Sequence, residues 1–109
     1  MNFMKIAIVT GASSGMGREM VYQLADRFGG LSEIWVIARR KERLDEFDGK
    51  LPLKVRKFAI DITDIESLNI LKNELEVVNP DVKILVNSAG CGKYGKIGEN
   101  TKYFVLFDE

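Results

Sequence analysis

The sequence contains no histidine, which excludes histidine general bases and histidine metal ligands from any site that it builds. Its single cysteine, Cys91, cannot form an internal disulfide, and one inert thiol fits a reducing compartment. Acidic and basic residues cancel at 16 each, so no net charge draws the chain to nucleic acid. The longest apolar stretch, Ile34 to Ala38, is far too short to span a bilayer. These absences predict a cytoplasmic protein that binds neither membranes nor nucleic acid.

The residues that are present suffice for one compact domain, because 46% of the 109 residues are hydrophobic. Short apolar runs, typical of buried parallel strands, alternate with stretches of helical periodicity. Four strands are expected, at residues 5–10, 34–38, 55–60 and 84–86. Three helices are expected between them, at about 15–28, near 44–47 and after Thr63.

The third of these helices has a predicted start and a predicted apolar face. Thr63-Asp64-Ile65-Glu66 has the form of a capping box, with Thr63 as the N-cap and Glu66 reaching back to it. Pro80 lies just beyond the expected end of the helix. One apolar stripe along the helix carries Ile65, Leu68, Leu71, Leu75 and Val78.

Strands that alternate with helices predict an α/β fold: a Rossmann-type parallel sheet with right-handed crossovers and flanking helices. The expected strand order is 3-2-1-4, which is one half of a doubly wound sheet with the first strand past its switch point. A dinucleotide bound to such a sheet lies in the cleft between strands one and four. Three residues fall at carboxyl ends of strands on the rim of that cleft: Gly11, Asp61 and Asn87.

The glycine-rich stretch Thr10–Gly17 lies on a turn from a strand to a helix. We expect Gly11 to let the chain leave the strand sharply, Gly15 to let backbone approach a pyrophosphate, and Gly17 to let the helix pack tightly on the strand. The N–H groups of the first helical turn, that of Met16 among them, then point at the anion. A tight turn with no ligand is the alternative interpretation.

The spacing Thr-Gly-x-x-x-Gly-x-Gly in this stretch resembles the cofactor-binding signature of the short-chain dehydrogenase/reductase family. It differs from the Gly-x-Gly-x-x-Gly of other Rossmann dehydrogenases. The resemblance extends over residues 5 to about 98. It implies an oxidoreductase that uses a nicotinamide dinucleotide and acts on a carbonyl or alcohol substrate.

The end of the second strand indicates which dinucleotide to expect. An acidic residue at this point would hold the adenosine ribose hydroxyls, but the sequence reads Ala38-Arg39-Arg40. The guanidinium of Arg39 suits a 2′-phosphate, and Ser13 and Ser14 lie nearby in the turn as donors to the same phosphate. We therefore expect NADP(H) rather than NAD(H). The alternative is that Arg39, Arg40 and Lys41 form a solvated charged loop.

Two further strand ends carry residues with counterparts in the family. The resemblance implies that Asp61 contacts the adenine amine and that the N–H of Ile62 contacts the ring; the alternative is that Asp61 caps the following turn. Asn87-Ser88-Ala89-Gly90 resembles the family's Asn-Asn-Ala-Gly, with Ser88 in place of the second asparagine. In the family this stretch stabilises the sheet and touches the cofactor ribose, and its small residues let backbone approach the ligand.

The family's catalytic Tyr-x-x-x-Lys pair is not found in the sequence. The tyrosines are Tyr22, Tyr94 and Tyr103, and the residues four positions later are Asp26, Gly98 and Phe107. We therefore expect residues 1–109 to be an NADP-binding half-domain without catalytic residues, whose parent alone binds a small-molecule substrate. A catalytically silent nucleotide-binding module is the alternative. A methyltransferase that binds S-adenosylmethionine is disfavoured, because it predicts an acidic residue where Arg39 stands.

Residues 99–109 form a tail whose structure is ambiguous. Asn100 or Thr101 suits a helix start, whereas Tyr103–Phe107 has strong β propensity, and we expect a helix or a disordered tail rather than an added strand. The fourth strand would then be an unpaired edge beside exposed apolar surface, which predicts self-association. The alternative is that the tail folds back and covers this edge.

Overall fold

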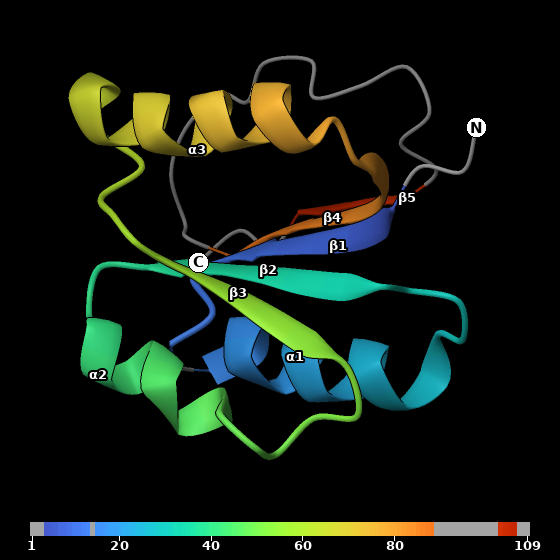
Figure 1. The fold of residues 1–109 in the computed structure, drawn as a ribbon. Helices are drawn as coiled ribbons and strands as arrows, with labels where there is room; N and C mark the ends of the chain where they lie inside the picture. The colour runs from blue at the N-terminus through green and yellow to red at the C-terminus, as the bar shows by residue number, and fades with distance from the viewer. Residues whose placement is uncertain (1–3, 14, 89–102, 107–109) are drawn as a thin grey trace.

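The computed structural model describes residues 4–13 and 15–88, together with the backbone of 103–106. These residues form one sheet of five parallel strands in the order β3-β2-β1-β4-β5 (Figure 1). The strands are β1 (Lys5–Thr10), β2 (Glu33–Ala38), β3 (Lys54–Ala59), β4 (Asp81–Asn87) and β5 (Tyr103–Leu106). The helices are α1 (Gly15–Arg27), α2 (Lys41–Leu44), the short 3-10 helix η1 (Asp45–Phe47) and α3 (Ile65–Val78). Within this part of the chain, no helix has the length and apolarity to cross a membrane.

The sheet lies between two layers of helices. Helices α1 and α2 cover one face and α3 covers the other (Figure 1). Alternation along β1 sends Ala7 and Val9 into the layer that contains α1 residues, and Ile6 and Ile8 into the layer that contains α3 residues. All six residues of β2 are buried, as expected for a central parallel strand that is covered on both faces. The core therefore consists of two apolar layers, one on each side of the sheet.

The predicted strand order 3-2-1-4 is confirmed, but the expectation for the tail is wrong at residues 103–106. These residues form β5, which pairs with β4 so that Ile84 lies opposite Tyr103 and Asn87 opposite Leu106. They are neither a helix nor a disordered tail, because a segment of high β propensity satisfies the backbone groups that β4 would otherwise leave unpaired. Strand β4 is therefore not an edge. Self-association stays a prediction, but an unpaired β4 no longer supports it. The other residues of the tail lie outside the described part of the chain.

Helix α3 begins one residue later than the capping box predicts. Its N-cap is Asp64, whose two carboxylate oxygens accept the Glu66 N–H at 3.3 Å and the Ser67 hydroxyl at 3.0 Å. The prediction of Thr63 as the N-cap is wrong, because its hydroxyl donates to Asp61 Oδ1 at 2.6 Å. The cap is thus decided by a competing acceptor two residues earlier.

The apolar stripe of α3 is only partly buried. Leu71 is buried, and Leu75 and Val78 pack against the same core layer. By contrast, Ile65 is 77% exposed and Leu68 is 40% exposed. Helical spacing predicts which side chains share a face, but it does not predict how far the sheet extends beneath that face.

A buried carboxylate holds the amino end of β2. Glu33 is 5% exposed, and its Oε1 accepts hydrogen bonds from Trp35 Nε1 at 2.9 Å and from Arg56 Nε at 3.0 Å. Arg56 also donates to Glu74 of α3 at 2.7 Å and lies over the Trp35 ring, 5.0 Å from its centroid. Burial acts to raise the pKa of Glu33, but the hydrogen bonds from Arg56 and Trp35 and the nearby positive charges lower it overall from its ordinary value of 4.5. The ionised Glu33 is therefore paired with Arg56, which connects β2 to β3 and also to α3.

We expect Glu33→Gln to lower the free energy of unfolding by about 1.5–3 kcal/mol, because hydrogen bonds to a charged group are lost inside the protein. Since the folded-state pKa lies below the unfolded value, this contribution is complete above pH 4.5 and is lost as the pH falls through the folded-state pKa. Urea denaturation at pH 7 and in steps below pH 4.5 measures both effects.

The control for this variant is Lys54→Met, which removes another cation near Glu33. The Lys54 side chain is 66% exposed and its Nζ lies 3.6 Å from Glu33 Oε2, so its loss should cost less than about 1 kcal/mol. Equal losses of unfolding free energy in the two variants would contradict the conclusion that the buried charge of Glu33 stabilises the fold. So would a difference between wild type and Glu33→Gln that persists undiminished in acid.

Candidate functional site

Parallel pairing brings the carboxyl ends of β1 to β4 to one edge of the sheet, which is where open α/β sheets bind their ligands. Four residues predicted from the sequence stand at or just after these ends: Gly11, Arg39, Asp61 and Asn87. The structure thus places them along one edge. Their contacts with a ligand remain predictions.

The turn from β1 to α1 needs glycine conformations at two positions. Gly11 and Gly15 have φ angles of +63° and +58°, in the left-handed region that residues with side chains rarely adopt. The Ala12 N–H donates to the carbonyl of Ile37 at 3.1 Å, which folds the turn over the end of β2. A Cβ added at Gly15 would meet no atom within 4 Å, so the turn is open on that side. The first N–H groups of α1, which have no intrahelical acceptor, are therefore available to an anion there.

Gly17 is required by space rather than by backbone conformation. It is buried, and a Cβ added there would overlap the carbonyl group of Gly11 and the hydroxyl oxygen of Ser88. Helix α1 therefore lies directly against the backbone of the turn and against the end of β4. This is the close packing that the glycine spacing predicts.

The hydroxyl of Ser88 joins the end of β4 to the glycine turn. Its Oγ donates to the Thr10 carbonyl at 2.7 Å and lies 3.3 Å from the Gly11 carbonyl oxygen, while its N–H also donates to Thr10 at 3.3 Å. Thr10 Oγ1 in turn donates to Asn87 Oδ1 at 2.8 Å inside the protein. Sequence reasoning noted Ser88 only as a departure from a pattern and gave Thr10 no role. The sequence does contain an indication of this contact, because each of the two apolar runs ends in a polar residue.

Asp61 organises the turn that follows β3. Its Oδ1 accepts the N–H of Thr63 at 2.9 Å and the hydroxyl of the same residue at 2.6 Å. These hydrogen bonds lower the pKa of Asp61, and the charge of Arg39 lowers it further. The capping role considered for Asp61 is therefore observed, whereas its contact with adenine stays a prediction. The effect of Arg39 shows that the ends of β2 and β3 act on each other electrostatically.

The other predicted residues differ in exposure. Met16 is 50% exposed, Ser13 is half-buried, and Ile62 packs against the core layer on the α3 side. Arg39 is exposed, as a residue that meets a ligand from solvent must be. Three predicted residues lie outside the described part of the chain: Ser14, Ala89 and Gly90.

A family model described as short chain dehydrogenase matches residues 5–104. The chain therefore belongs to the short-chain dehydrogenase family. The very-long-chain 3-oxoacyl-CoA reductase of Candida albicans is 36% identical over 90 residues, which are 79% of this chain and 25% of that protein. The NAD-dependent glycerol dehydrogenase of Listeria innocua is 33% identical over 87 residues, which are 79% of this chain and 33% of that protein. The chain thus spans about a quarter to a third of the length of these relatives.

A solved structure supports the same assignment. The L-sorbose reductase of Gluconobacter frateurii, described in complex with NADPH and L-sorbose, has a TM-score of 0.67 and 30% sequence identity. The match covers 87% of this chain and 36% of that one. The Rossmann-type sheet predicted from the sequence is confirmed, and so is membership of an oxidoreductase family.

Replacing Gly17 by alanine should disrupt the turn. We expect Gly17→Ala to lower the free energy of unfolding by about 1–3 kcal/mol, because the added methyl group overlaps backbone that cannot move alone. Gly29→Ala is a matched control, since a Cβ there meets nothing within 4 Å, and it should change stability by less than about 0.5 kcal/mol. Thermal or urea denaturation compares the two. Similar stability of both variants would show that the contact between α1 and the turn is loose.

Proposed function

We propose that this chain binds NADP(H) at the carboxyl edge of the sheet, between β1 and β4, as the cofactor-binding part of a short-chain dehydrogenase or reductase. Bound NADP(H) would supply hydride transfer between its nicotinamide and the carbonyl or alcohol carbon of a small substrate. The observation that carries the choice of cofactor is Arg39, an exposed guanidinium at the end of β2 where a carboxylate would favour NAD(H).

The pyrophosphate would lie against the first turn of α1. This helix has 13 residues and no acidic side chain in its first turn, so its dipole and free N–H groups face an anion unopposed. Gly15 leaves the approach open, because no atom occupies the space that its Cβ would take. Ser88 and Gly17 contact the backbone of Thr10 and Gly11 on the side of β4 and α1.

The 2′-phosphate would meet Arg39. A guanidinium presents two parallel N–H groups to phosphate oxygens, which gives paired charge-assisted hydrogen bonds. Membership of the family does not choose the cofactor, since one relative is named as NAD-dependent and a solved neighbour is described with NADPH. The choice therefore rests on the residues of this chain.

The rest of the dinucleotide would follow the edge of the sheet. The adenine ring would lie beside Asp61 and Ile62, next to Arg39, and Ser13 and Ser14 would add donors near the 2′-phosphate. The cofactor ribose would pass the end of β4, where the Thr10–Asn87 hydrogen bond fixes the strand. This path follows the carboxyl ends of β3, β2, β1 and β4 in their order across the sheet.

A catalytically silent nucleotide-binding module is the second candidate. It is favoured by one observation, that no tyrosine in these 109 residues is followed four positions later by lysine. Both candidates share the same cofactor site and differ only in whether hydride transfer follows binding.

We expect NADPH to bind more tightly than NADH, and Arg39→Asp to reverse this order, because a bidentate contact worth about 1.5–3 kcal/mol becomes a repulsion. Calorimetric titration of both cofactors measures the ratio. Arg27→Asp is the control: it makes the same charge change on the last turn of α1, at the far end of the helix from the turn, and should leave the ratio unchanged. Equal affinity of the wild type for both cofactors would overturn the proposal.

Residues 1–109 on their own should not reduce carbonyl compounds with NADPH. These residues contain no Tyr-x-x-x-Lys pair to transfer a proton to the substrate. Without that proton transfer the rate falls by a factor of about 10²–10⁴. The measurement is NADPH oxidation with a panel of ketones and aldehydes, with a parallel titration to show that cofactor is bound. Turnover that follows the purified chain through successive columns would contradict this expectation.

A further inference from the structure

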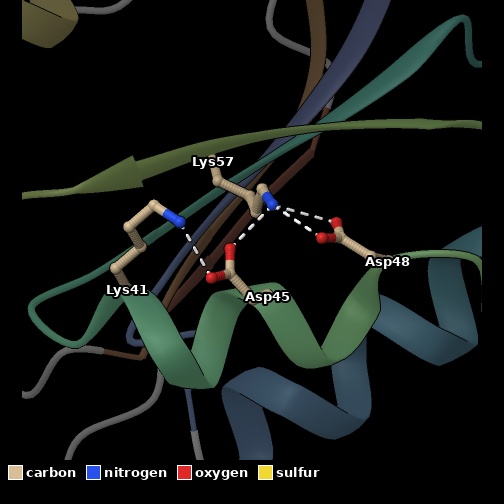
Figure 2. A network of polar contacts seen from close by, with 4 residues as sticks. All are labelled: Lys41, Asp45, Asp48 and Lys57. Carbon is tan, nitrogen blue, oxygen red and sulfur yellow. Dashed lines mark hydrogen bonds and ion pairs between the residues drawn. The ribbon is translucent and has the colours of Figure 1, made fainter.

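Lys41 is the third of three consecutive basic residues that follow β2, and it is bound to a carboxylate. Lys41 begins α2, and its Nζ lies 2.9 Å from Asp45 Oδ2 (Figure 2). The other oxygen of Asp45 accepts from Lys57 Nζ of β3 at 2.7 Å, and Lys57 also donates to both oxygens of Asp48 at 3.0 and 2.9 Å. Two lysines and two aspartates thus form a neutral cluster between β3 and the helical segment of α2 and η1.

Within this cluster, Asp45 is fixed and Lys41 is the movable member. The Lys57 side chain is 26% exposed and that of Asp45 is 36% exposed, whereas that of Lys41 is 72% exposed. The hydrogen bonds from Lys41 and Lys57 lower the pKa of Asp45, so its carboxylate is ionised throughout the physiological range. Asp45 is therefore a permanent negative charge that is held by Lys57 of β3 and that attracts the more exposed Lys41.

The two residues before Lys41 are in a different situation. Arg39 and Arg40 are both exposed, and neither side chain forms a hydrogen bond or an ion pair with the described residues. Of three consecutive cations at the end of β2, two are therefore available to a phosphate and the third is held by Asp45.

We propose that Asp45 is a specificity-determining residue, which limits the preference for a 2′-phosphorylated dinucleotide by holding Lys41 away from the phosphate. This inference rests on the proposed binding of NADP(H) beside Arg39. When Asp45 loses its charge, Lys57 keeps its contact with Asp48, and the buried Leu44 and Phe47 keep α2 and η1 in place. Lys41 is then released, and its flexible stem lets the ammonium group turn toward the phosphate.

The test is Asp45→Asn, with the affinities for NADPH and NADH measured by titration of cofactor fluorescence at low ionic strength. We expect NADPH to bind about two- to fivefold more tightly, the range that one exposed charge pair provides, while NADH binding stays within about 1.5-fold. In a Lys41→Met background the gain from Asp45→Asn should vanish. Asp48→Asn is the matched control: it removes the same charge from the same cluster but leaves the Lys41–Asp45 pair intact.

Two results would overturn the inference. One is an equal gain from Asp45→Asn and Asp48→Asn, and the other is a gain that persists without Lys41; either would indicate a general effect of charge. The single variant Lys41→Met provides an independent test, since removing one exposed side chain leaves the fold intact. It should change NADPH affinity less than about twofold, and a larger loss would show that Lys41 already contacts the phosphate.

The same assay separates this inference from the proposal on which it rests. If Arg39→Asp reverses the cofactor order and Asp45→Asn does not increase the preference for NADPH, the role of Asp45 is wrong and the cofactor site stands. If wild type does not distinguish NADPH from NADH, both are wrong.

Discussion

The close contact between α1 and the end of β4 is the constraint on which the site depends. The helix can lie against the backbone of Gly11 only because residue 17 has no side chain, and the Ser88 hydroxyl occupies the remaining space. This contact fixes where the first turn of α1 begins relative to the sheet. It thereby directs the free N–H groups of the helix to the carboxyl ends of the strands, where the predicted binding residues stand. A looser contact would leave these residues at the same edge, where parallel pairing puts them, but would no longer fix the first turn of α1 beside them.

The charged residues at the two ends of the sheet differ in burial and in pairing. At the amino end, Glu33 is buried and its charge is matched by Arg56, which also joins Glu74 on α3. At the carboxyl end, Arg39 is exposed and has no hydrogen-bonded partner among the described residues. The buried, paired charge and the exposed one therefore lie at opposite ends of the sheet, because parallel pairing puts all the amino ends of these strands at one edge and all the carboxyl ends at the other.

Much of the fold was predictable from the sequence, because apolar runs and glycine spacing act locally. The four strands and the glycine turn depend on residues close together in the chain, and each was predicted. The strand order joins β1 to the distant β4, and it was predicted from the topology that alternating strands and helices favour. Strand β5 was missed although its β propensity is plain in the sequence, because its formation also depends on an open neighbour, β4. The N-cap of α3 was misplaced for a similar reason, since Asp61 captures the Thr63 hydroxyl. The role of Ser88 depends on a carbonyl 78 positions away, which no local pattern contains.

The single tryptophan has a consequence of a different kind. Trp35 has no accessible surface, its indole N–H is bonded to Glu33, and a guanidinium lies over its ring. The chain therefore carries one indole fluorophore, which lies in the interior near the amino end of β2 and away from the carboxyl edge of the sheet. Its emission reports whether the core layer on the α3 side of the sheet is assembled. Folding of this layer can thus be followed in solution through one intrinsic optical signal.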